Sequence, residues 1–172
     1  SAMDELEDIT SNSDGIMVAR GDLGVETNPE DVPIHQRTMV AECRKQGKPC
    51  IVATQMLESM IESPTPTRAE ASDVATAIFQ GVDAVMLSAE SAAGQYPQES
   101  VQMMDKIIKR VEADDKYKNN LTNYNLSHTK NTAEAIARAA FNVAEIIDSN
   151  CLVTFSKSGR SIVRVSRMRP DV

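Results

Sequence analysis

Three short apolar runs, each followed by a polar cluster and then by a helical pattern, constrain the fold of this chain most strongly. The runs cover residues 15–19, 49–53 and 84–87. They are continuous rather than alternating, which is typical of strands covered on both faces in a parallel sheet. The polar clusters contain Asp22, Thr54 and Ser88, which are spaced 32 and 34 residues apart. Because a βα unit takes roughly 30 residues, the pattern predicts three consecutive βα units.

Helix start and stop signals lie between these runs. Pro33 suits the first turn of a helix, and Gly47 suits a helix end. Residues 67–70, Thr-Arg-Ala-Glu, read as a capping box, and Gly81 would end that helix. Pro97 opens a further amphipathic pattern. The sequence therefore predicts one helix after each strand.

The remainder of the chain reads as a linker and a second α/β unit. Residues 116–131 are polar and rich in Asn, as linkers are, and Thr132 is a good N-cap. The residues that then recur at helical spacing are Ile136, Ala140, Val143 and Ile147. Residues 151–155 are expected to form a buried strand that runs into a basic helix. The predicted organisation is thus a cloning scar at 1–3, a first domain at 4–115, a linker at 116–131 and a second domain at 132–172.

Composition excludes several classes of protein. The 172 residues carry a net charge of −7, with a pI near 4.9 and 3% aromatic residues, which argues against a nucleic-acid binder. No apolar run is long enough for a transmembrane helix, and no signal segment is evident. The three scattered cysteines indicate reduced thiols in a cytoplasmic protein. The two distant histidines make a His-based zinc site or a Ser-His-Asp triad improbable.

Polar side chains at the carboxyl ends of the predicted strands are candidates for chemistry. Functional groups collect at this edge in parallel α/β folds. Asp22, between Gly21 and Gly24, suits Mg²⁺, which often takes only one or two protein carboxylates. Thr54 offers a hydroxyl without a nearby base, so it would position water or relay a proton. The alternative interpretation, turn and helix-cap residues, has about even odds for any single cluster.

A second candidate is residues 156–161, Ser-Lys-Ser-Gly-Arg-Ser, at the start of the last predicted helix. Hydroxyls, a glycine and two cations at a helix N-terminus would form a phosphate cradle. An ordinary N-cap turn with solvated charges fits the pattern about equally well.

Long ordered motifs in the chain resemble the pyruvate kinase family. Residues 13–26, SDGIMVARGDLGVE, are similar to that family's magnesium-binding strand and loop. Residues 53–61 and 64–70, ATQMLESMI and PTPTRAE, resemble its most recognisable segment. MLSAESAAG at 86–94 and SGRS at 158–161 resemble two further segments. The resemblance extends over nearly the whole chain after Met3.

The resemblance implies a partial (β/α)₈ TIM barrel, comprising its last three βα units, followed by the first helix–strand–helix of an α/β C-terminal domain. A complete barrel needs about 250 residues. The family's catalytic Lys and its second Mg²⁺-binding carboxylate lie in a K-[LIV]-E motif, which this sequence does not contain. The isolated chain is therefore expected to be inactive.

The resemblance also assigns roles to residues. Asp22 would bind Mg²⁺, and the amides of Gly21 and Asp22 would bind the substrate carboxylate. Thr54 would lie in the substrate site and act in proton transfer, with Ser88 as a weaker relay candidate. The phosphate of a sugar-phosphate effector would bind the loop residues Ser156, Ser158, Gly159, Arg160 and Ser161.

The implied reaction is phosphoryl transfer from phosphoenolpyruvate to ADP, giving pyruvate and ATP, the last step of glycolysis. Its cofactors are Mg²⁺ and K⁺, with the K⁺ ligands outside this chain. A homo-oligomer, a tetramer in the family, is expected, with neither nucleic acid nor membrane as a partner. One alternative is a non-catalytic piece that keeps only assembly or effector-binding surfaces. A third alternative is another barrel enzyme acting on phosphoenolpyruvate or pyruvate, which the length of the match over residues 54–70 argues against.

Overall fold

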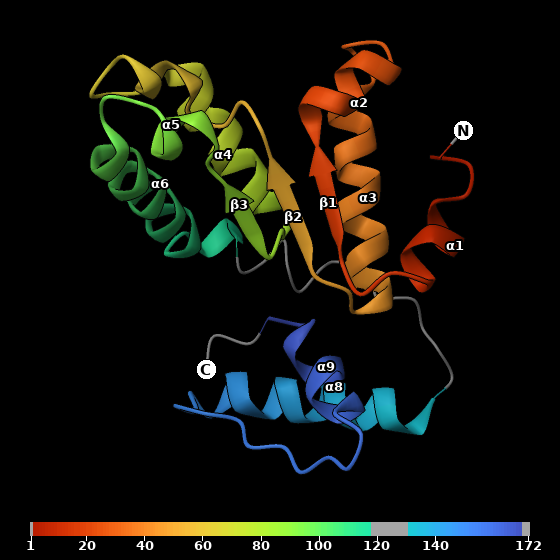
Figure 1. Cartoon of the computed structure of the whole chain (residues 1–172). Coiled ribbons are helices and arrows are strands. Elements are labelled where there is room, and N and C mark those ends of the chain that lie inside the picture. The colour runs from red at the N-terminus through yellow and green to blue at the C-terminus, as the bar shows by residue number, and fades with distance from the viewer. Residues whose placement is uncertain (1, 118–130, 170–172) are drawn as a thin grey trace. The chain divides into compact units, whose positions relative to one another are not determined.

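The computed structural model describes residues 2–117 and 131–169 (Figure 1). The chain divides into two compact units, Ser1–Asn120 and Leu121–Val172. Most of the expected linker, residues 118–130, lies outside the described residues, as do residues 1 and 170–172.

A three-stranded parallel sheet forms the centre of the first unit (Figure 1). Its strands are β1 (Ile16–Ala19), β2 (Cys50–Ala53) and β3 (Ala84–Met86), in that order across the sheet. Ala19 pairs with Ala53, and Ala53 with Met86, so the three strands end level with one another. The predicted strands and their parallel arrangement are confirmed.

Each strand is followed by helical structure. The helices of the first unit are α1 (Leu6–Ser11), α2 (Arg20–Glu26), α3 (Val32–Gln46), the 3₁₀ helix η1 (Glu58–Ile61), α4 (Arg68–Gln80), α5 (Ala89–Ala92) and α6 (Pro97–Glu112). Gly47 and Gly81 end α3 and α4 in the left-handed conformation, with φ of 69° and 85°. Thr67 and Glu70 form the predicted capping box.

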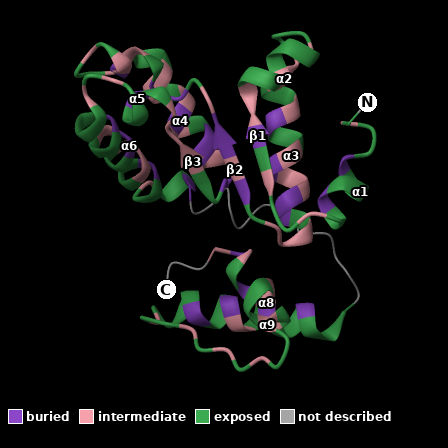
Figure 2. Cartoon of the chain, in the orientation of Figure 1, coloured by how far each residue is buried: buried purple, intermediate pink, exposed green. Residues whose placement is uncertain are grey.

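The core of this unit lies between the sheet and the helices, where Val18, Val40, Val52 and Val74 are all buried. α3 packs against β1 and β2, and α4 packs against α6. The prediction that all three strands are covered on both faces is wrong for β1 and β3. In β1, Val18 is 1% exposed, whereas its neighbour Met17 is 48% exposed, and in β3 Ala84 is exposed and no residue is buried. Figure 2 shows β1 with both buried and exposed segments. Successive side chains of a strand point to opposite faces, and only one face of β1 is covered by helices.

The second unit is built from α8 (Thr132–Ile146) and α9 (Arg160–Ser166), which pack together. The N-cap of α8 is Asn131, whose side chain accepts a hydrogen bond from the Ala133 amide, so the predicted cap is displaced by one residue from Thr132. Its small core consists of Ala137, Phe141, Val165 and Met168. The predicted apolar stripe is the wrong one, because Ile136, Val143 and Ile147 are exposed.

The predicted buried strand at residues 151–155 is absent. Val153 is 73% exposed and Phe155 is 95% exposed. A strand requires a neighbour to pair with its amides and carbonyls. The regular elements described in this unit are the two helices, so the segment has no strand to pair with.

Two further properties concern the described part of the chain. Cys43, Cys50 and Cys151 form no disulfide, and the first two are buried. Among the residues of known placement, no helix is both long and apolar enough to cross a bilayer.

Candidate functional site at the carboxyl edge of the sheet

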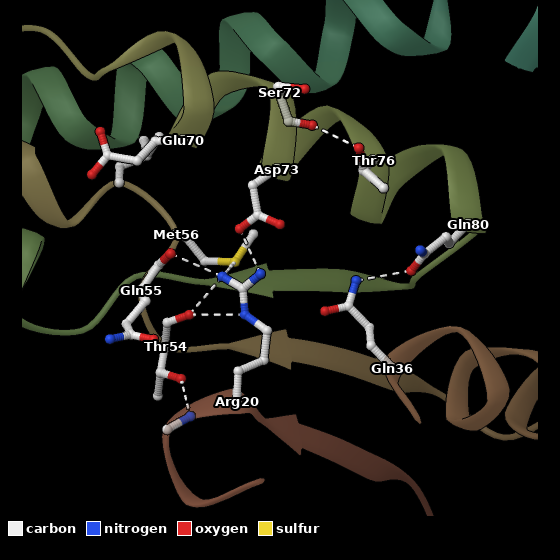
Figure 3. Close-up of polar contacts among 12 residues, drawn as sticks. Arg20, Gln36, Thr54, Gln55, Met56, Glu70, Ser72, Asp73, Thr76 and Gln80 are labelled. Atoms are coloured by element: carbon white, nitrogen blue, oxygen red, sulfur yellow. Dashed lines mark hydrogen bonds and ion pairs between the residues drawn. The ribbon is translucent and has the colours of Figure 1, made fainter. Parts of the chain in front are cut away.

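The carboxyl ends of the three strands bring the predicted site residues to one edge of the sheet. Arg20 and Gly21 directly follow β1, and Thr54 directly follows β2. Because Ala19 and Ala53 are paired, Arg20, which begins α2, and Thr54, which begins the turn after β2, lie at the same level (Figure 3). Ser88 lies two residues beyond the end of β3.

A hydrogen bond between Gly21 and Thr54 joins the start of α2 to the turn after β2. The Gly21 amide donates to Thr54 Oγ1 at 2.9 Å. A Cβ atom at Gly21 would lie 3.7 Å from the same oxygen, which is ordinary contact distance. The structure therefore brings together two residues that the sequence placed in the substrate site.

The guanidinium group of Arg20 also joins the start of α2 to the turn after β2 (Figure 3). Nε and one terminal nitrogen donate to the Thr54 carbonyl oxygen at 3.1 and 2.7 Å, and that terminal nitrogen also donates to the Gln55 carbonyl oxygen at 2.9 Å. The other terminal nitrogen forms an ion pair with the Asp73 carboxylate at 2.5 Å. Asp73 belongs to α4, so Arg20, itself in α2, contacts both the turn after β2 and α4.

The turn after β2 has an unusual backbone. Thr54 and Gln55 have φ values of 71° and 53°, in the left-handed region. A β-branched residue rarely adopts this conformation, because its Cβ substituents crowd the carbonyl oxygen. Such strain costs of order 1–3 kcal/mol and persists only where surrounding contacts hold it.

Glu90 fixes the third strand end from inside the protein. It is 3% exposed, and its carboxylate accepts hydrogen bonds from the Leu57 amide at 3.1 Å and the Ser88 amide at 2.7 Å. Glu90 thus links the backbone at Ser88, which directly precedes the short helix α5, to the backbone at Leu57, in the segment after Thr54. Ser88 itself is half-buried at this edge.

Asp22 lies in the first turn of α2 and is exposed. The predicted glycine-flanked loop is wrong here, since α2 begins at Arg20 without an intervening loop. Within residues 2–117 and 131–169, no group of three or more His, Cys, Asp or Glu is arranged to hold a metal. Mg²⁺ keeps several waters and often binds through one or two carboxylates plus substrate phosphates. Asp22 therefore fits as one ligand of Mg²⁺, and the other ligands would have to be water, substrate or further residues.

The other predicted site, residues 156–161, lies in the second unit. Gly159 caps α9 in the left-handed conformation, with φ of 77°, and Arg160 is the first helical residue. Ser158 and Arg160 are exposed, whereas Ser156, Gly159 and Ser161 are half-buried. The predicted loop therefore ends at Gly159, and Arg160 and Ser161 belong to the first turn of α9.

Sequence reasoning missed the residues that hold the edge together: Arg20, Asp73 and Glu90. Arg20 and Glu90 stood in the polar clusters but were given no role. Their position beside candidate residues was the available signal. Asp73 lies within a helix and carried no signal of its own.

Comparison with known proteins agrees with this architecture. Residues 1–101 match the family model of the pyruvate kinase barrel domain. Curated pyruvate kinases from Agrobacterium vitis and Methylorubrum extorquens are 52% and 48% identical to the chain, each over 99% of its length. A crystal structure of a pyruvate kinase from Cryptosporidium parvum has a TM-score of 0.88 at 39% identity, covering 98% of this chain and 34% of that one.

The chain spans about a third of the length of these curated relatives, 35% and 36% respectively. The family match nevertheless covers more than half of the chain's own residues. On the strength of that match, the chain belongs to the pyruvate kinase family.

Proposed function

We propose that this chain supplies the last three βα units of a pyruvate kinase barrel and the beginning of its C-terminal domain. In the assembled enzyme, the carboxyl edge of its sheet would form part of the site that transfers phosphate from phosphoenolpyruvate to ADP. One observation carries the proposal: Gly21, which directly precedes Asp22 at the start of α2, donates a hydrogen bond to Thr54 in a chain of this family.

The start of α2 suits the substrate carboxylate. Amides in the first turn of a helix lack intrahelical partners and favour an anion. We infer that the substrate carboxylate takes over the Gly21 amide, which now donates to Thr54 Oγ1. That exchange would release the Thr54 hydroxyl to turn toward the substrate.

Asp22 would hold Mg²⁺ beside the same carboxylate. When bound, the ion neutralises charge on the phosphoryl group and on the enolate oxygen. Asp22 is exposed and follows Gly21 in the first turn of α2, so its carboxylate would be free to bind the ion close to the Gly21 amide.

Thr54 would act after phosphoryl transfer. The enolate of pyruvate must then gain a proton on its methylene carbon, and we infer that the Thr54 hydroxyl would relay it from solvent. Ser88, at the neighbouring strand end, is a weaker candidate for the same relay. A hydroxyl in this role acts as a relay rather than as a strong acid, because its pKa is far above neutrality.

Three further proposals concern the protein as a whole. The intact enzyme would be a homo-oligomer in the cytoplasm, using K⁺ bound by residues outside this chain. The loop at 156–161 would bind the phosphate of a sugar-phosphate effector through its amides and through Arg160. The 172-residue chain alone would be inactive, because its sequence lacks the K-[LIV]-E motif.

The test uses a chimera in which these residues replace the matching segment of the Agrobacterium vitis pyruvate kinase, which is 52% identical. Two activities are measured: ATP formation, and exchange of the pyruvate methyl protons with D₂O followed by NMR. Thr54→Ala should slow proton exchange more than phosphoryl transfer. Equal rates of both activities in Thr54→Ala and the parent chimera would remove Thr54 from the reaction.

A further inference from the structure

We propose that Arg20 is a positioning residue that holds Thr54 in its left-handed conformation, so that the Thr54 hydroxyl stays directed at Gly21. The inference rests on the proposed function of Thr54. Arg20 would act through Thr54 and would not itself contact the substrate.

The contacts of Arg20 are those of a clamp on a backbone turn. Its side chain is 10% exposed, and its hydrogen bonds to Thr54 and Gln55 go to their carbonyl oxygens. Those two residues are the ones with φ of 71° and 53°. A hydrogen bond to a carbonyl oxygen fixes the orientation of its peptide plane. The guanidinium group therefore restrains the backbone of the strained turn directly, and not through the Thr54 or Gln55 side chains.

Asp73 orients the Arg20 guanidinium from the side opposite the turn. Its carboxylate pairs with the terminal nitrogen that does not contact the turn, at 2.5 Å. The planar guanidinium is therefore held at both ends, by α4 and by the turn after β2 (Figure 3). A lysine ammonium would present a point charge and could not reproduce this fork.

The strain at Thr54 explains why a clamp is needed. A threonine freed from these contacts would relax toward negative φ, where its backbone is more stable. That rotation would move Oγ1 away from the Gly21 amide. Small misplacements of reacting groups lower rates by about 100-fold, so the clamp would affect turnover without touching the substrate.

A double-mutant cycle in the chimera separates positioning from general stability. Arg20→Lys should lower kcat by up to about 10-fold, the loss expected for removing the Thr54 hydroxyl itself, with KM within about threefold, and Asp73→Asn should have a smaller effect in the same direction. In the Thr54→Ala background, Arg20→Lys should change kcat by less than about twofold. An equal loss in both backgrounds would overturn the proposal, because Arg20 would then act independently of Thr54.

NMR of the 172-residue chain tests the clamp even if the chimera has no activity. Arg20→Lys and Asp73→Asn should shift the Gly21 amide resonance and raise its hydrogen exchange rate at least about fivefold, with the largest changes confined to residues 20–22 and 54–56. Lys109→Ala, which breaks the exposed pair with Asp105 on α6, should leave Gly21 unchanged. An unaltered Gly21 amide in both Arg20→Lys and Asp73→Asn would overturn the proposal. A shifted Gly21 amide in an inactive chimera would instead contradict only the proposed function.

Discussion

The amide of Gly21 and the hydroxyl of Thr54 meet at 2.9 Å although 33 residues separate them in sequence. Parallel pairing of β1 with β2 makes the contact possible, because it brings the two strand ends level. A substrate that competes for the Gly21 amide would change the surroundings of Thr54 at the same time. Binding and proton delivery would thus be coupled through a single hydrogen bond.

The first prediction concerns the Thr54 hydroxyl. In the chimera, Thr54→Ala should lower turnover by about 10-fold, less than the loss of a full general acid, because water can partly replace a relay hydroxyl. Thr54→Ser keeps the hydroxyl and should retain more activity than Thr54→Ala. Steady-state kinetics check both variants, and a serine variant as impaired as the alanine variant would show that the methyl group matters instead.

The second prediction concerns Glu90, whose carboxylate accepts hydrogen bonds from the Leu57 and Ser88 amides. Glu90→Ala leaves both donors without that acceptor and should lower the free energy of unfolding by about 2–3 kcal/mol. Urea unfolding of the 172-residue chain measures the loss. The exposed Glu58→Ala variant is the control and should stay within about 0.5 kcal/mol of the parent. Comparable losses in the two variants would contradict the structural role of Glu90.

The third prediction is the pH dependence set by Glu70. Burial alone would raise the pKa of Glu70, but hydrogen bonds from Ser59 and Thr67 outweigh it and lower the pKa below the ordinary 4.5. A carboxyl with a lowered pKa in the folded state stabilises the fold above its unfolded pKa, and this contribution is lost as pH falls through the folded value.

Glu70→Gln should therefore be less stable than the parent by about 1 kcal/mol at pH 7, because Gln loses the charge and replaces one of the two accepting carboxylate oxygens with an NH₂ group. The difference should shrink steadily below pH 4.5, the ordinary value. Urea unfolding at several pH values gives both numbers. A difference between parent and variant that is independent of pH would show that charge on Glu70 contributes nothing.

The fourth prediction compares two glycines. A Cβ atom at Gly94 would lie 2.7 Å from the Glu90 carbonyl oxygen and 3.1 Å from the Ile61 Cα, both backbone atoms that cannot easily move. A Cβ atom at Gly24 would meet nothing within 4 Å. Gly94→Ala should destabilise the chain by about 1–3 kcal/mol, whereas Gly24→Ala, within helix α2, should be neutral or stabilising. Thermal unfolding of both variants checks the contrast.

The first unit shows how far local sequence signals reach. Gly47, Gly81 and the Thr67 capping box act within one helical turn, and each ends or begins a helix where the sequence predicts. Thr54 shows the limit of such signals. Threonine disfavours the left-handed conformation, so the residue type alone does not predict the observed φ of 71°. That conformation depends on contacts from Arg20, a residue distant in sequence.

The second unit shows the same limit for a strand. Residues 151–155 have the apolar composition of a buried strand, but strand formation depends on a neighbour, and composition cannot supply one. On α8, both Ile136 and Ala137 are apolar, so the pattern alone could not show which stripe would pack against α9.

The central claim is that the carboxyl edge of this sheet is part of a pyruvate kinase active site, with Asp22 holding Mg²⁺. The most direct test is Mg²⁺-dependent ATP formation from phosphoenolpyruvate and ADP by the chimera carrying Asp22→Ala. Glu26→Ala, at an exposed residue later on the same helix, is the matched control. We predict that the parent and the control are active, that Asp22→Ala loses at least about 1,000-fold in kcat/KM, and that its circular dichroism is unchanged. A folded Asp22→Ala chimera with a near-normal rate and unaltered Mg²⁺ dependence would contradict the account.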